Sequence, residues 1–239
     1  VVDTIPGSLW RYSGGGYTIA QLVGSDVTGR PFARVMQDVV LDPLGMYEST
    51  FEQPIPERLA DDAAVAHGWD GEPVAGDWHT YPEQAAAGLW TTPTDLARFA
   101  LGVARAYNGQ SNGFLSRELA TEMLSPVLEG TYGLGFGVLG EGEELRFSHG
   151  GSNEGYRCYL VMYPETGDGL VVMTNGDGGA DLSAEIHRAV SDVYGWPHTK
   201  PEVRNPVSID PALLERYAGE YELPWGQRYT LRAVDGTLH

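Results

Sequence analysis

The sequence contains one lysine, one cysteine and no long apolar run. The single lysine, Lys200, restricts any lysine-dependent chemistry to one position. The single cysteine, Cys158, excludes a disulfide within the chain. A membrane-spanning helix needs about 18 or more consecutive apolar residues, and the sequence has no such run, so none is expected. The formal net charge of −18 is the opposite of the basic surface that phosphate binding needs, which argues against nucleic acid as a partner.

The rest of the composition is typical of a globular protein. Of its 239 residues, 42% are hydrophobic and 20% are charged, enough for one sizeable core with a small appendage. The acidic excess favours solubility. No cofactor is predicted, and no metal site either, because the histidines do not stand at the spacing of metal ligands; their positions are 67, 79, 149, 187, 198 and 239.

Apolar residues recur at helical spacing in the first half of the chain. The pattern predicts helices at 17–28, at 31–40, after a cap at Thr92 and after Ser116. Gly29 should end the first of these helices and Asp42-Pro43 the second. Between the second predicted helix and the cap at Thr92, residues 47–90 are rich in loop-forming residues, and a long loop inside a compact domain is often functional.

From about residue 132 the apolar pattern changes to a period of two. It predicts four strands and a covering helix, at 132–139, 145–151, 156–163, 170–175 and 181–194. Short turns between strands favour antiparallel pairing. We therefore predict an α+β fold over residues 1–196, with an antiparallel sheet flanked by helices. A proline-rich linker is predicted over 197–211, followed over 212–239 by the start of a small β domain.

Tyr12 stands immediately before Ser13 and Gly14, where the first predicted helix begins. A helix N-terminus presents free backbone N–H groups and the positive end of the helix dipole. That field stabilises a nearby tyrosinate and would help the tyrosine to act as a general base. A tyrosine before a glycine-rich turn is also a common structural feature, so this motif alone decides nothing.

A second local signal is His149, followed by Gly150, Gly151 and Ser152 at the end of a predicted strand. Paired glycines allow another backbone to approach closely. They also leave the backbone N–H of Ser152 available to face a substrate oxyanion. Alone, the motif fits an ordinary turn as well. A third segment, Asp42-Pro43-Leu44-Gly45-Met46 with Ser49-Thr50-Phe51 after it, fits a helix end with core contacts.

Together these motifs resemble the penicillin-recognising, serine β-lactamase-like family. The family includes class C β-lactamases, D-alanyl-D-alanine carboxypeptidases, D-aminopeptidases and related carboxylesterases. Its members carry Ser-x-x-Lys, then Tyr-x-Asn, then Lys-Thr-Gly or His-x-Gly on an edge strand. Tyr12-Ser13-Gly14 falls at the second motif and His149-Gly150-Gly151 at the third. Residues 43–46 and 86–99 also match common stretches of the family, and the resemblance covers roughly residues 6–195.

The resemblance implies a β-lactamase/transpeptidase-like fold and a serine hydrolase that acts on a small molecule or short peptide through an acyl-enzyme. It implies catalytic roles for Tyr12 and His149. Oxyanion or substrate contacts are implied for a second group of residues, which are Ser13, Gly14, Gly150, Gly151 and Ser152. Residues 212–239 resemble the start of the lipocalin-like β-barrel domain of some members. The oligomeric state and the substrate are left open.

Two departures from the family pattern shape the functional prediction. Gly14 stands where the family usually has asparagine, which favours an esterase or peptidase over a β-lactamase. The chain has no Ser-x-x-Lys, so we predict that the nucleophile lies in a segment before Val1 and that residues 1–239 alone are inactive. Three alternatives remain: a true β-lactamase, a non-catalytic binding or regulatory module, and a cysteine hydrolase built on Cys158. Strand alternation around Cys158 favours a buried thiol over a nucleophile.

Overall fold

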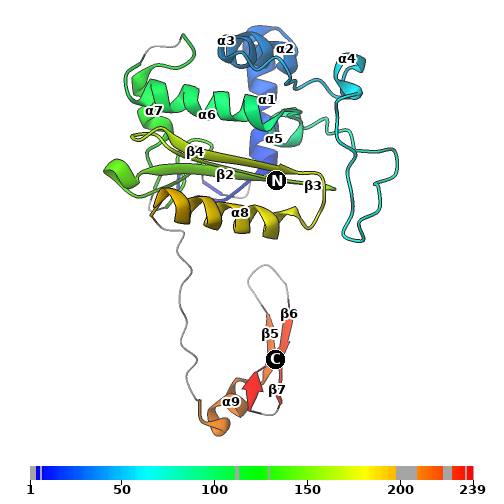
Figure 1. The fold of residues 1–239 in the computed structure, drawn as a ribbon, viewed down its shortest axis with the longest axis vertical. Helices are drawn as coiled ribbons and strands as arrows, with labels where there is room; N and C mark the ends of the chain where they lie inside the picture. The colour runs from blue at the N-terminus through cyan, green and yellow to red at the C-terminus, as the bar shows by residue number, and fades with distance from the viewer. Residues whose placement is uncertain are drawn as a thin grey trace. The chain divides into compact units, whose positions relative to one another are not determined.

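The computed structural model describes residues 4–5, 7–110, 113–128, 130–197, 209–222, 228–234 and 236–238. The chain divides into two units, Val1–Lys200 and Pro201–His239. In the first unit, an antiparallel sheet in the order β1-β2-β3-β4 lies between helices (Figure 1). Helix α6 contacts β3 and β4 from one face of the sheet and α8 contacts them from the other. The predicted α+β fold with an antiparallel sheet and flanking helices is confirmed.

The four strands of this sheet are β1 Gly137–Leu139, β2 Arg146–Asn153, β3 Tyr156–Tyr163 and β4 Asp168–Thr174. β3 has the predicted bounds, and β2 and β4 differ from prediction by a few residues. The predicted strand 132–139 is wrong over 132–136. Gly133 donates its N–H to the carbonyl of Phe136 at 2.9 Å, and Gly135 has φ +92°, so the chain turns before the strand begins.

The helices of the first unit are α1 Gly14–Thr28, α2 Phe32–Met36, α3 Asp42–Leu44, α4 Glu57–Ala60, α5 Gln84–Ala87, α6 Pro93–Tyr107, α7 Arg117–Met123 and α8 Gly179–Tyr194. The helix predicted to stop at Asp42-Pro43 continues through a π-helical turn, Gln37–Leu41, to Leu44. Pro43 lies in the first turn of α3, where its missing N–H is tolerated. Gly45, at φ +67°, ends the helix instead.

The core follows from the period of two along β3. Leu160 and Met162 are buried in a cluster with Val103 of α6 and Phe147 of β2. The alternate residues, Val161 and Tyr163, pack on the opposite face with Trp196 and the partly buried Val190 of α8. One strand thus supplies side chains to the cores on both faces of the sheet, and this packing fixes the position of the sheet between α6 and α8.

The second unit contains α9 Pro211–Tyr217, β5 Gly219–Glu222, β6 Arg228–Leu231, β7 Ala233–Val234 and β8 Thr237–Leu238. Strands β5 and β6 form an antiparallel pair, and α9 was not predicted. The Asp210 side chain caps α9 by accepting the N–H of Ala212 at 2.9 Å. Most of the predicted linker, 197–211, and also Lys200, lie outside the described residues, and the lipocalin-like barrel stays a prediction. Within the described residues, no helix has the length and apolar character to cross a membrane.

Candidate active site

Tyr12 immediately precedes α1. The helix begins at Gly14, three residues before its predicted start, because the Ser13 hydroxyl accepts the N–H of Gly16 at 3.0 Å. This N-cap offsets the poor helix propensity of three successive glycines. The cap places the ring of Tyr12 at the positive end of a 15-residue helix, as the sequence predicted. It also gives Ser13 a structural function that does not depend on substrate.

The structure brings Tyr12 and His149 together. The phenol ring and the imidazole of β2 lie nearly parallel, with ring centroids 6.2 Å apart and an angle of 28° between the planes. The two residues are 137 positions apart in the sequence (149 − 12), so only the tertiary fold can place them side by side. A tyrosine and a histidine at this separation can both contact one small substrate group.

A cavity of about 270 Å³ lies beside this pair. Trp10 and Tyr132 form its aromatic wall, stacked with ring centroids 4.5 Å apart, and Tyr132 meets Tyr12 edge-on at 6.5 Å. The residues that line the cavity are Trp10, Arg11, Tyr12, Ser13, Gly16, Tyr17, Ala20, Tyr132, Gly133, Gly135 and His149. Trp10 and Tyr132 were not among the residues predicted to form the site, because nothing in the local pattern connects positions so far apart.

The edge of β2 beyond His149 is open. Strand β1 pairs with β2 only as far as Gly137 opposite Ser148. From His149 to Asn153 the described residues provide a partner strand only on the β3 side. In an antiparallel strand alternate backbone N–H groups point to each edge, so this stretch has backbone donors available to a ligand. Ser152, the predicted oxyanion donor, lies on this edge and is exposed.

Gly150 and Gly151 are not equivalent. A Cβ on Gly151 would lie 2.4 Å from the sulfur of its cross-strand neighbour Cys158, which is far inside contact distance. A Cβ on Gly150 would meet its nearest atom, the carbonyl oxygen of Cys158, at an ordinary 3.7 Å. The sequence predicted that another backbone approaches these glycines, but the close neighbour at Gly151 is the side-chain thiol of Cys158. Burial raises the pKa of that thiol, which disfavours a thiolate nucleophile at Cys158.

Helix α5 connects the two motifs. Gln21 of α1 donates to the carbonyl of Pro82 at 3.2 Å and accepts the N–H of Ala85 at 3.0 Å. On the other side, the Asn153 side chain of β2 donates to the carbonyl of Ala87 at 2.9 Å. These three bonds fix the middle of α1 relative to the end of β2. A Cβ on Gly14 would meet only the Cβ of Ala86, at an ordinary 3.8 Å, so the backbone there has room for a Cβ.

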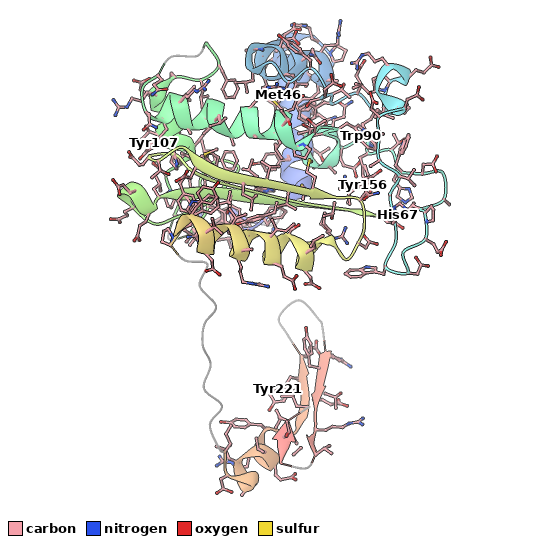
Figure 2. All side chains as sticks on the ribbon, in the orientation of Figure 1. Met46, His67, Trp90, Tyr107, Tyr156 and Tyr221 are labelled. Atoms are coloured by element: carbon pink, nitrogen blue, oxygen red, sulfur yellow. The ribbon has the colours of Figure 1, made fainter. Side chains whose placement is uncertain are left out.

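A polar cluster fixes the turn between β2 and β3. The Asp177 carboxylate accepts the N–H of Gly155 at 2.9 Å and pairs with Arg157 at 2.8 Å. Tyr156 donates its hydroxyl to the carbonyl of Ala64 at 2.5 Å, which anchors the long loop to the sheet. Figure 2 shows Tyr156 near Trp90 at this end of the sheet, with the two rings edge-on at 5.9 Å. Burial, with smaller contributions from nearby acidic groups, raises the pKa of Tyr156 to about 12, so it stays protonated at neutral pH.

The segment that follows Pro43, residues 44–51, forms a helix end with core contacts, as its sequence suggested. The fully buried Asp95 carboxylate of α6 accepts the Ser49 hydroxyl at 2.9 Å and the N–H of Glu48 at 2.9 Å. The Asp95 side chain thus holds this segment to α6. A second hollow, of about 610 Å³, lies beside the segment and shares no residue with the Tyr12–His149 cavity.

The described residues contain no group of three or more His, Cys, Asp or Glu side chains arranged to hold a metal ion.

Comparison with known proteins identifies the family. Residues 2–194 match the Beta-lactamase family. The chain belongs to the β-lactamase family. The match covers both motifs and nearly the whole first unit, so the resemblance noted in the sequence is confirmed. Members of this family are serine hydrolases, and the sequence of this chain contains no Ser-x-x-Lys.

Relatives agree with this assignment. Penicillin-binding protein 4 of Amycolatopsis lactamdurans is 26% identical over 94% of the chain and 62% of its own length. The octameric penicillin-binding protein homologue from Pyrococcus abyssi has a TM-score of 0.66 at 23% identity, over 98% of the chain and 52% of its own. D-amino acid amidase from Ochrobactrum anthropi SV3 has a TM-score of 0.63 at 19% identity, over 80% and 59%. The chain thus spans about half to three-fifths of these relatives, and the structural matches show a shared fold.

Proposed function

We propose that the chain supplies the tyrosine and histidine part of a serine hydrolase site that cleaves an ester or amide through an acyl-enzyme. The observation that supports this proposal is the contact between Tyr12 and His149, whose rings lie 6.2 Å apart beside a cavity. The nucleophilic serine and its lysine lie in a segment that precedes Val1. Residues 1–239 alone are therefore inactive, since they hold a base and part of an oxyanion hole and no nucleophile.

Tyr12 has the role of general base in this mechanism. With the lysine of the preceding segment, it takes the proton of the serine hydroxyl as the serine attacks the substrate carbonyl, and it later helps to activate water. The N-terminus of α1 supports the negative charge that develops on Tyr12. His149 contributes a polar group beside the substrate and Tyr12.

The open edge of β2 supplies the second oxyanion donor. The backbone N–H of Ser152, with that of the nucleophile, stabilises the tetrahedral intermediate, and one such donor contributes about 3 kcal/mol. Because Gly150 and Gly151 have no side chains, a substrate can lie close to the backbone along this strand edge. Ser13 and Gly14 form the opposite border of the site.

The substrate we favour is an uncharged ester or amide over a penicillin. Gly14 provides no side-chain amide for the amide group of a β-lactam. Where the Lys-Thr-Gly form of the motif offers a lysine ammonium to a substrate carboxylate, this chain has the imidazole of His149. D-amino acid amidase, a structural neighbour, shows that amide chemistry occurs on this fold.

We also propose that β5 to β8, the strands of the second unit, begin a lipocalin-like barrel.

The test uses the protein together with the segment that precedes Val1 and compares Tyr12→Phe with Tyr47→Phe. Tyr47 is a matched control, because it is 71% exposed against 63% for Tyr12 and lies away from the site. With p-nitrophenyl butyrate, Tyr12→Phe should lower kcat/KM by roughly two or more powers of ten, as loss of a general base does, and Tyr47→Phe should leave it unchanged. Equal rates for Tyr12→Phe and wild type would remove Tyr12 from the mechanism. No hydrolysis by any form would favour a non-catalytic module.

A further inference from the structure

Four rings form a continuous row beside the candidate site. Trp10 stacks on Tyr132, with centroids 4.5 Å apart. Tyr132 meets Tyr12 edge-on at 6.5 Å, and Tyr12 lies nearly parallel to the His149 ring at 6.2 Å. All four residues line the same cavity. The row therefore connects the Tyr12–His149 pair with an aromatic surface, Trp10 and Tyr132, that has no part in the proposed chemistry.

The cavity leaves ring surface uncovered and has room beside it. Trp10 is 43% exposed, and Tyr132 is half-buried. Part of the remaining lining consists of small residues, which are Gly16, Ala20, Gly133 and Gly135. A flat group of a ligand can therefore lie against the rings without displacing a large side chain. A ligand ring that extends the row would gain edge-to-face or offset-stacked contacts in addition to the burial of its apolar surface.

The size and charge of the cavity restrict the group that it can hold. Pockets that enclose a drug-sized molecule start at about 300 Å³, and this cavity is about 270 Å³, so it takes one side group of a ligand. The described residues that line it include Arg11 and no carboxylate. The chain has 33 acidic residues, and the second hollow contains Asp42, Glu48 and Asp62. A ligand ammonium would lose water here, find no carboxylate and lie near a like charge.

We propose that Trp10 and Tyr132 make this cavity a binding subsite for one uncharged aromatic group, and that they are specificity-determining residues of the site. Ligands with a phenyl-sized ring bind there in preference to ligands with a short alkyl chain. Ligands that carry a free ammonium next to the ring bind less well. That the ring belongs to the substrate of ester or amide cleavage rests on the proposed function; the binding of the ring does not.

The first test measures binding to the 239-residue chain, which needs no nucleophile. Three amides are titrated and followed by NMR: 3-phenylpropanamide, butyramide, which lacks the ring, and D-phenylalaninamide, which adds an ammonium to the first skeleton. The Kd of 3-phenylpropanamide should be lower than that of butyramide by about tenfold, and lower than that of D-phenylalaninamide by at least about threefold. Equal Kd values for the first two amides, or tightest binding of D-phenylalaninamide, would overturn the proposal.

Variants locate the binding in this cavity. Trp10→Ala should weaken binding of 3-phenylpropanamide by about tenfold, and Trp10→Phe, which keeps a ring, by less than about threefold. Trp69→Ala is the matched control, because Trp69 is 77% exposed and lies outside the cavity lining, and it should leave Kd unchanged. Ala20→Leu fills the cavity from an exposed helix position, so it should block the ring while the chain stays folded. Equal effects of Trp10→Ala and Trp69→Ala, or full binding by Ala20→Leu, would place the ring elsewhere and refute the subsite.

The second test measures turnover by the protein that includes the segment before Val1. Ethyl 3-phenylpropanoate has its ring on the acyl side, 2-phenylethyl butyrate has it on the alcohol side, and ethyl butyrate has none. At least one ring ester should exceed ethyl butyrate in kcat/KM by about tenfold, and Tyr132→Leu should abolish that excess. Hydrolysis without a preference for either ring would refute the subsite and leave the proposed function intact. Binding of the ring as expected without hydrolysis of any ester would refute the proposed function and leave the subsite intact.

Discussion

Replacing Gly151 with alanine tests the geometry of the third motif without relying on activity. The new Cβ would lie 2.4 Å from the Cys158 sulfur, so β2 and β3 must separate or the thiol must leave its position. Gly151 does not have a positive φ, so the substitution adds a steric clash and no backbone strain. Overpacking of this kind costs about 1–3 kcal/mol, which lowers Tm by roughly 2–12 °C in a domain of this size.

The structure supplies both a control and a rescue for this substitution. At Gly150 the new Cβ would have its closest contact at 3.7 Å, so Gly150→Ala should change stability little. Cys158→Ala removes the sulfur and leaves a Cβ 3.9 Å from the new methyl group, so the double variant should recover most of the loss. Urea unfolding of wild type, Gly151→Ala, Cys158→Ala and the double variant gives the coupling energy between the two positions as a double-mutant cycle. Additive effects of Gly151→Ala and Cys158→Ala, or a Gly151→Ala variant as stable as wild type, would refute the contact.

Three further outcomes follow from named contacts. In the protein that includes the segment before Val1, Gly14→Asn should raise kcat/KM for nitrocefin relative to p-nitrophenyl butyrate by roughly ten- to a hundredfold, because it supplies a side-chain amide at a position where a Cβ fits; an unchanged ratio would contradict the substrate argument. Ser13→Ala should destabilise the chain by about 0.5–2 kcal/mol in urea unfolding and Ser13→Asp should not, since only alanine removes the cap. The pKa of Tyr156 is raised from 10.0 to about 12, so its stabilising contribution is complete below pH 10 and is lost between pH 10 and 12. Tyr156→Phe should weaken that alkaline loss, which unfolding measured from pH 8 to 12 will show.

Much of the fold could be predicted because local patterns agree with the tertiary structure. Thr92 and Pro93 start α6 as caps do, and the alternation in β3 places side chains on both faces of the sheet. The errors occurred where tertiary contacts override local propensity. Residues 132–136 have the composition of a strand, but the Gly133–Phe136 hydrogen bond turns the chain. The start of α1 was missed because the Ser13 cap outweighs three helix-breaking glycines.

The candidate site was predictable only in part. The sequence pointed to Tyr12 and His149 as candidate site residues, and the structure places their rings together. It did not identify the aromatic wall of Trp10 and Tyr132, or the bond from Asn153 to α5, because these depend on contacts between distant segments. The roles of the individual site residues stay predictions.

The central claim is that Tyr12 and His149 serve a serine located before Val1. The most direct measurement treats two proteins with a fluorophosphonate probe, the 239-residue chain and the protein with its preceding segment, and maps the adduct by mass spectrometry. We expect one adduct, on a serine of a Ser-x-x-Lys motif before Val1, formed more slowly in the Tyr12→Phe variant, and none on the 239-residue chain. An adduct on a serine within residues 1–239, together with ester hydrolysis by that chain alone, would contradict it.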